Sequence, residues 1–220
     1  MLSHVVVGHL ETINKNARQQ VLEQFERIAN FSGSEEPGVL RYAITVPRDE
    51  TDETTIYAIE EYKDQKVSDD HIASSPVQSL ISMFGSQPTV LTTPPKVYQL
   101  EYTSETHQFT RPRVSTRSNP FIVFATATQP SRGSTAEVTD VWAKVVEKAE
   151  AHEPNTLLYA LVRDKENQNQ IGTIEAYADE AAFEEHCKSP EVEGLVARNK
   201  QIGGEMGFVA LKLVTGWLSR

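Results

Sequence analysis

Two histidines are the residues of this sequence best suited to proton-transfer chemistry. His71 and His186 lie at corresponding places in a chain that repeats itself, and imidazole titrates near neutral pH. A side chain of this kind could take a proton from a bound molecule and return it later. The structural alternative is that each histidine is exposed or caps the second helix of its repeat.

Two tyrosine–glutamate pairs accompany the histidines. Tyr62 shares a strand face with Glu60, and Tyr177 with Glu175, because residues two apart on a strand point the same way. A buried tyrosine hydroxyl needs a partner, and a neighbouring carboxylate can supply one. The functional interpretation is an acid/base set that lines a cavity. The structural interpretation, a core tyrosine with a glutamate in an ion pair, is favoured because a repeat keeps scaffold residues as readily as catalytic ones.

Four aromatic residues lie at matching positions of the two repeats. Phe25 and Trp142 are on the apolar stripe of the first helix of each copy. Core packing is the usual role of such a stripe, but beside a cavity these rings could stack on a planar ligand and so contribute to substrate binding. Tyr42 and Tyr159 are expected to be structural and to pack under the same helices.

The composition excludes several classes of protein. The 220 residues carry a net charge of −10, which argues against nucleic-acid binding. No apolar run approaches the roughly 20 residues of a membrane span, and the first residues lack a secretory pattern, so we expect a cytoplasmic protein that binds no membrane. Cys187 is the single cysteine, which excludes a disulfide framework. It follows His186, but neighbours on a helix point about 100° apart, so a thiol–imidazole pair is not expected.

Nothing in the sequence resembles a cofactor site. There is no Gly-x-Gly-x-x-Gly after a predicted strand and no phosphate-binding glycine loop. The six histidines form no metal-ligand pattern. We therefore expect neither a cofactor nor a metal.

An internal repeat organises the chain. The segment 36–43 recurs at 153–160 and the segment 59–64 at 174–179, and the small change of offset falls in a polar, turn-like stretch between them. The chain is therefore predicted to hold two copies of one unit. The predicted boundaries are 1–103 for the first repeat, 104–118 for a linker and 119–220 for the second repeat.

The apolar periodicities occur in the same order in both copies. Each has a strand, an amphipathic helix, two alternating strands, a helical region interrupted at a proline, and a last strand. The predicted elements are 4–11, 15–31, 38–46, 55–62, 64–83 and 96–102, then 121–128, 134–151 (capped by Ser134 or Thr135), 156–163, 171–177, 179–202 and 207–216. This β-α-β-β-α-β order is the ferredoxin-like arrangement, an α+β fold.

The sheets are predicted to be apolar on both faces, because odd-numbered and even-numbered positions of 39–46 and 157–162 both carry apolar residues. Such a sheet must be covered on both faces. Helices cover one face, and the antiparallel sheet of the other repeat covers the second most economically. We therefore expect the two sheets to pack face to face as an intramolecular α+β barrel, and a small-molecule pocket in each half between sheet and helices.

With these motifs the sequence resembles the antibiotic biosynthesis monooxygenase family of dimeric α+β barrels, present as a fused tandem. The resemblance lies in Glu36-Pro37-Gly38 with Tyr42, in Ile59-Glu60-Glu61-Tyr62-Lys63-Asp64, and in His71 with Ser74-Ser75-Pro76. The second copy has Glu153-Pro154, Tyr159, Ile174-Glu175-Ala176-Tyr177-Ala178-Asp179, and His186 with Ser189-Pro190. The resemblance covers nearly the whole chain except the linker.

The resemblance implies a cofactor-independent monooxygenase that inserts oxygen into a small phenolic, quinol or polyketide-derived substrate. The partners would be that substrate and O2. A deprotonated substrate of this kind reduces dioxygen itself, so the protein must supply a base, orientation and a dry cavity. His71 and His186 would transfer protons, and Tyr62 and Tyr177 would orient the substrate.

Other functions stay open on the same fold. An isomerase, cyclase or decarboxylase would use the same groups without oxygen, and a non-catalytic ligand-binding or stress-response barrel would use none of them. Haem binding is a further, less favoured alternative. The expected state is a monomer that mimics a dimer of single repeats, with further dimerisation through exposed strand edges as an alternative.

Overall fold

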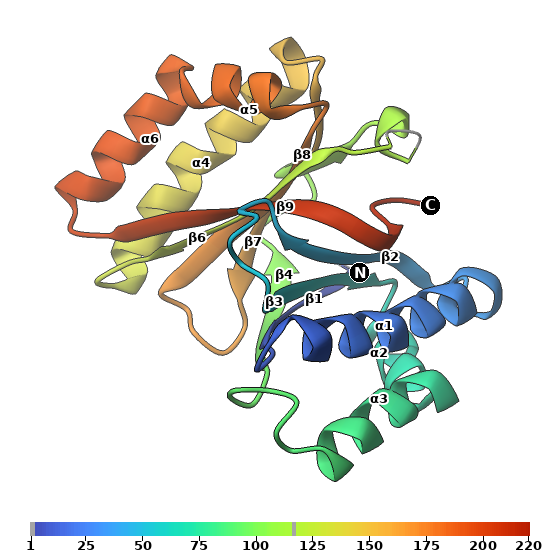
Figure 1. Cartoon of the computed structure of the whole chain (residues 1–220). Coiled ribbons are helices and arrows are strands. Elements are labelled where there is room, and N and C mark those ends of the chain that lie inside the picture. The colour runs from blue at the N-terminus through green and yellow to red at the C-terminus, as the bar shows by residue number, and fades with distance from the viewer. Residues whose placement is uncertain (1–2, 116–117) are drawn as a thin grey trace. The chain divides into compact units, whose positions relative to one another are not determined.

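The structure, a computed structural model, describes residues 3–115 and 118–220 and divides into two compact units. The first unit holds the residues up to Gln99 together with Leu213–Arg220, and the second holds Leu100–Lys212. Both follow the predicted β-α-β-β-α-β order, with the second helical region split into two helices (Figure 1). The α+β class with two ferredoxin-like repeats is therefore confirmed.

The first unit is a sheet with helices on one face. Its sheet has the order β4-β1-β3-β2-β9, to which β9 contributes its last residues. In Figure 1 the helices of this unit, in blue to green, lie together on one side of its strands. Its elements are β1 His4–Glu11, α1 Lys15–Glu35, β2 Val39–Pro47, β3 Thr55–Tyr62, α2 Gln65–Ala73, α3 Ser75–Ser86 and β4 Lys96–Tyr102.

The second unit repeats this plan. Its sheet has the order β9-β6-β8-β7-β5, and the end of β4 also pairs with β7. Helix α4 packs against α6 and β7, and α5 against β7 and β8. Its elements are β5 Gln108–Thr110, η1 Pro112–Val114, β6 Phe121–Thr128, α4 Arg132–His152, β7 Thr156–Asp164, β8 Gln170–Tyr177, α5 Glu180–Cys187, α6 Pro190–Gln201 and β9 Glu205–Trp217.

Side-chain caps begin the helices that carry the site. Asp179 accepts a hydrogen bond from the backbone N–H of Ala182 at 3.0 Å and so begins α5. Pro190 occupies the first turn of α6, where its missing N–H costs no hydrogen bond. Helix α4 begins at Arg132, two residues earlier than predicted, because Ser131 rather than Ser134 or Thr135 is the N-cap and accepts from the Ser134 N–H at 3.2 Å.

Each unit has its own core between the sheet and the helices. In the first, Val21, Phe25 and Ile28 of α1 pack on Tyr42 and Tyr62 of the sheet. In the second, the matching residues are Val138, Trp142, Val145, Tyr159 and Tyr177. The alternation of side chains along β3 and β8 places the tyrosines and the neighbouring glutamates on this helix-facing side.

Two segments differ from the sequence-based expectation. Part of the range 104–118, predicted as a linker, forms β5 and η1, and β5 pairs with β7 of the second unit; residues 116 and 117 lie outside the described residues. The last strand of the second repeat, predicted at 207–216, is observed as β9 over Glu205–Trp217. The end of this strand belongs to the first unit. Such pairings join segments far apart in the chain, so local periodicity carries no information about them.

Candidate functional site

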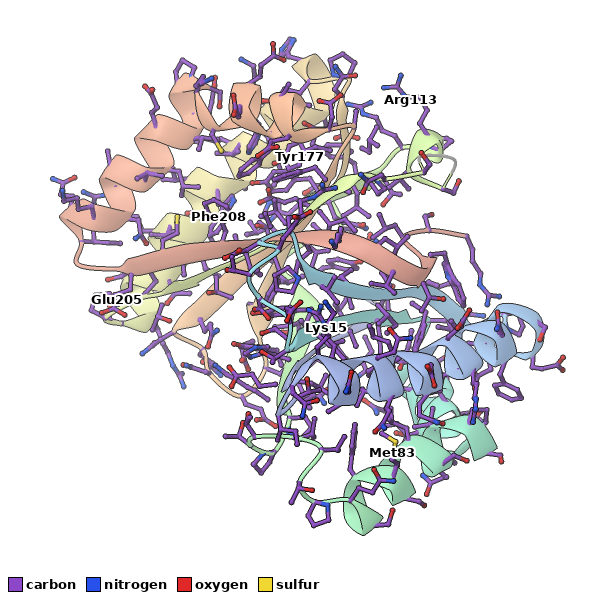
Figure 2. The ribbon with its side chains drawn as sticks, in the orientation of Figure 1. Lys15, Met83, Arg113, Tyr177, Glu205 and Phe208 are labelled. Atoms are coloured by element: carbon purple, nitrogen blue, oxygen red, sulfur yellow. The ribbon has the colours of Figure 1, made fainter. Side chains whose placement is uncertain are left out.

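The second unit contains an apolar cavity of about 320 Å³ between its sheet and its helices. This is where the sequence predicted a pocket. Figure 2 shows Phe208 on the side of β9 that faces α4 and α6, and Tyr177 between the sheet and α5. The lining residues come from the sheet (Val123, Ala125, Tyr159, Glu175, Met206, Gly207, Phe208) and from the helices (Trp142, Phe183, His186, Cys187, Val192, Leu195, Val196).

His186 is held at the cavity wall by a carboxylate. It lies in the last turn of α5, is only 4% exposed, and its Nδ1 is 2.8 Å from Oε2 of Glu153. Glu153 directly follows α4 and also accepts a hydrogen bond from the Thr156 hydroxyl at 2.9 Å. The rings of Tyr159 and Tyr177 both lie against the imidazole, each with its centroid 5.4 Å away.

The pair of His186 and Glu153 has the chemistry of a positioned base. An ionised carboxylate can only accept, so Nδ1 carries a proton and donates it, which leaves Nε2 as the acceptor. Burial raises the pKa of Glu153, but the hydrogen bond and charge of His186, with the Thr156 hydroxyl, outweigh this and lower the pKa below its ordinary value. The carboxylate therefore stays charged at neutral pH and stabilises an imidazolium when one forms.

The Glu153 side of this pair borders a second hollow. That hollow has a volume of about 350 Å³ and is lined by polar residues, including Lys148, His152 and Glu185. His186 lines both hollows, whereas Glu153 lines only the polar one. The His186–Glu153 pair thus stands in the wall between an apolar and a polar space.

A second carboxylate, Glu175 on β8, faces the apolar cavity and is 4% exposed. Tyr177 donates its hydroxyl hydrogen bond to Oε2 at 2.6 Å, and the Thr173 hydroxyl donates to Oε1. Trp142 donates its indole N–H to the Tyr159 hydroxyl at 2.9 Å. These bonds tie the polar groups of the cavity wall to α4 and to the sheet.

Burial first, and the charge of Glu175 next, raise the pKa of Tyr159 and of Tyr177 well above the ordinary value for tyrosine. Both hydroxyls are therefore protonated at physiological pH and act as hydrogen-bond donors rather than as bases. Beside them, the Nε2 of His186 is left as a hydrogen-bond acceptor.

The first unit contains the same local arrangement. His71 is 3% exposed, and its Nδ1 is 2.8 Å from Oε2 of Glu36, which also accepts from the Ser32 hydroxyl at 2.5 Å. Tyr62 donates to Glu60, which is partly exposed. Burial raises the pKa of Glu60 and of Tyr62.

The predicted site residues form two groups, one in each repeat. Of those in the second repeat, His186, Glu175 and Trp142 line the cavity, whereas Tyr177 is outside the lining and donates a hydrogen bond to Glu175. In the first repeat, His71 packs against Tyr42 and Tyr62. The last two predicted residues of that repeat are Glu60, which accepts from Tyr62, and Phe25, which belongs to the core. Both histidines are buried, so the alternative of an exposed histidine is wrong.

Several residues of the site were missed by sequence reasoning. Glu36 and Glu153 were seen only as part of the repeated Glu-Pro, although their recurrence upstream of each histidine was a usable signal. Tyr159 packs under α4 as expected but also lines the cavity. Phe183 and Phe208 gave no signal, because Phe183 corresponds to Ser68 in the first repeat and Phe208 becomes a wall only through folding.

Cys187 also lines the cavity. Burial, followed by the charges of Glu175 and Glu153, raises the pKa of its thiol to about 11. The thiol is thus protonated at neutral pH and is a poor nucleophile. Within residues 3–115 and 118–220, no three His, Cys, Asp or Glu side chains form a group that could hold a metal ion. In the same described ranges, no helix is long and apolar enough to cross a membrane.

Comparison with models of protein families shows the family to which the chain belongs. The model of the family described as "Antibiotic biosynthesis monooxygenase" matches the chain twice, over residues 3–81 and 120–198. The chain belongs to this family. The two matches fall on the two repeats, so the protein is a tandem antibiotic biosynthesis monooxygenase-family chain. No curated protein matches it.

Solved structures with the same fold extend over the whole tandem. A proposed monooxygenase from Fusobacterium nucleatum aligns with a TM-score of 0.78 at 18% identity, covering 100% of this chain and 97% of its own. A proposed monooxygenase from Lactobacillus acidophilus aligns with a TM-score of 0.74 at 17% identity and covers 100% of both chains. An anthrone oxidase-like protein aligns with a TM-score of 0.65 at 13% identity, covering 98% and 92%. At these identities the likeness concerns the fold.

Proposed function

We propose that this member of the antibiotic biosynthesis monooxygenase family is a cofactor-independent oxygenase of small phenolic or related aromatic compounds, with its active site in the cavity of the second unit. The observation that carries the proposal is the buried His186–Glu153 pair in the wall of an apolar cavity. Family membership supports the reaction class.

In the proposed mechanism His186 acts as the base. Its Nε2 takes the proton of a substrate hydroxyl, and Glu153 stabilises the resulting imidazolium. The substrate anion is electron-rich and passes electrons to dioxygen, so the protein has to supply position and shelter from water rather than a redox group.

The reaction balances without a further reductant when the oxidised group is a ring methylene. One molecule of dioxygen converts the methylene into a carbonyl and releases one molecule of water. The carbon loses its two hydrogens and four electrons, which reduce both oxygen atoms. The proton held by His186 returns to the oxygen that leaves as water, so the base is restored at the end of the turnover.

The aromatic walls suit a flat substrate. Trp142, Phe183 and Phe208 line the cavity, and the Phe183 ring contacts those of Phe208 and Tyr177 at 5.3 and 5.4 Å between centroids. Rings of this kind stack on planar molecules. A volume of about 320 Å³ lies at the lower end of small-molecule sites and fits a molecule of two or three fused rings.

Oxygen uptake tests the proposal. Purified, chelator-treated protein is incubated with naphthols, hydroquinones and anthrones, and the protein-free oxidation rate is subtracted. We expect uptake that falls about 10²- to 10⁴-fold in kcat/KM for His186→Gln. His107→Gln, which changes a histidine outside this cavity, is the control. If no compound is oxidised above the protein-free rate, the proposal is wrong. Conversion that persists without oxygen would favour an isomerase, cyclase or decarboxylase instead.

A further inference from the structure

The apolar cavity contains one carboxylate that no cation balances. Glu175 is the single acidic side chain among the described residues that line it. Its oxygens accept hydrogen bonds from the hydroxyls of Thr173 and Tyr177, and in the described part of the chain no lysine or arginine forms an ion pair with it. Each of its two carboxylate oxygens therefore accepts a hydrogen bond from a neighbouring hydroxyl, and neither acts as a donor.

The other polar group of the cavity does not offset this charge. His186 becomes cationic when protonated, but Glu153, 2.8 Å from its Nδ1, already supplies the matching negative charge. The remaining lining residues are apolar or neutral, among them Trp142 and Phe183. Glu175 therefore presents hydrogen-bond acceptors with no cation beside them, among lining side chains that are mostly apolar.

A neutral hydroxyl-bearing ligand and a carboxylate ligand are expected to interact with Glu175 in opposite ways. A neutral hydroxyl group can donate a hydrogen bond to Glu175, which accepts and cannot donate. A ligand carboxylate would lose its hydration, find no unbalanced cation and be repelled by Glu175.

From this arrangement we infer that the cavity selects neutral, hydroxyl-bearing aromatic molecules and rejects aromatic carboxylates, with Glu175 as the residue that determines this specificity. The inference rests on the proposed function for the aromatic nature of the ligand. It adds the charge and the hydrogen-bonding group by which the ligand is chosen.

Binding of a matched pair of ligands tests the inference. 1-Naphthol is neutral at pH 7 and 1-naphthoate is an anion of nearly the same shape. Titration calorimetry on the full chain is expected to show naphthol bound at least about 10-fold more tightly than naphthoate. Glu175→Gln keeps the size of the side chain and removes its charge, so we expect it to reduce this ratio at least about 10-fold, mainly by tighter binding of naphthoate.

The control is Glu184→Gln. Glu184 is an exposed carboxylate of the same helix as His186, lies outside the cavity lining and pairs with Lys188 at 3.4 Å. This variant removes the same charge from the same unit, and the ligand ratio is expected to stay as in the unmodified protein. An equal change in both variants would mean that net charge, rather than Glu175, sets the preference, and would overturn the inference.

A second measurement needs no substitution in the cavity wall. Cys187 is the only cysteine, lines the cavity and is exposed enough for a reagent to reach it, so a ligand bound beside it is expected to change its rate of alkylation by iodoacetamide at pH 8.5. Naphthol is expected to slow alkylation at concentrations where naphthoate does not. Equal protection by both ligands, or an unchanged ratio in Glu175→Gln, would overturn the inference. Selective binding without oxygen uptake would count against the proposed oxygenation alone, because neither binding readout depends on turnover.

Discussion

At the scale of single residues, the buried charge of Glu153 links the site to stability. Its pKa is lowered in the folded protein, since the hydrogen bond and charge of His186 outweigh the effect of burial. A carboxyl group of this kind stabilises the fold above its unfolded pKa. That contribution is lost as the pH falls from the ordinary value of 4.5 through the lower folded value.

We therefore expect Glu153→Gln to be less stable than the unmodified protein at pH 7, and the difference in unfolding free energy to shrink towards pH 3. Urea unfolding at a series of pH values measures this. A difference that stays constant over the whole range would show that the variant acts through something other than the loss of its charge.

The tyrosine hydroxyls make a second prediction at this scale. Tyr177→Phe removes the donor to Glu175, which is buried, and is expected to lower the unfolding free energy by about 1.5–3 kcal/mol, the range for a hydrogen bond to a charged group. Tyr62→Phe removes the donor to Glu60, which is partly exposed, whereas Glu175 is buried, so its loss should be smaller. Denaturant titration compares the two, and a larger loss for Tyr62→Phe would contradict the burial argument.

At the scale of elements, α5 carries His186 to the cavity wall, and its first turn depends on Asp179. This N-cap has a counterpart in Asp64, which accepts from the Val67 N–H at 2.9 Å and begins α2. Both helices are short, so one cap is a large part of what orders their first turn.

Asp179→Ala and Asp64→Ala are each expected to lower the unfolding free energy by about 1 kcal/mol. Because α5 bears residues of the apolar cavity and α2 bears none, Asp179→Ala should also weaken naphthol binding, whereas Asp64→Ala should leave it as it is. Denaturant unfolding and calorimetry check the two parts. Equal losses of binding in both variants would show that binding follows general stability rather than the position of α5.

At the scale of the whole molecule, the two repeats of the sequence are not the two units of the structure. The end of the chain, Leu213–Arg220, belongs to the first unit. There Trp217 donates its indole N–H to the Leu40 carbonyl at 3.2 Å, and Arg41 donates to the Leu218 carbonyl at 2.8 Å. Gly216 has a φ of +90°, and a Cβ at this position would overlap the Tyr42 carbonyl oxygen.

Gly216→Ala is therefore expected to destabilise the first unit, which contains β2, and to affect the second unit much less. Hydrogen–deuterium exchange measures each unit separately and should show faster exchange in β2 with little change in β8. Gly194→Ala is the control, because a Cβ there meets nothing within 4 Å. Equal loss of protection in β2 and β8 would contradict the division into units.

The sequence by itself determined the repeat, the order of strands and helices, and the residues that recur near the site. Apolar periodicity and proline positions are local, and they placed β1, β3, β4 and β6 at the observed bounds. Duplication made His71 and His186 visible as a pair. The α+β class followed from this order alone.

Only the tertiary structure decided which of these residues form a site. Glu153 and His186 are separated by 33 positions, and their contact depends on where α4 ends and α5 begins. The cavity needs Phe208 of β9 opposite Phe183 of α5, and Ser68 stands in the first repeat where the second has Phe183. Contacts of this kind depend on how elements pack across long sequence separations, and the alternation of apolar residues within each element does not encode that packing.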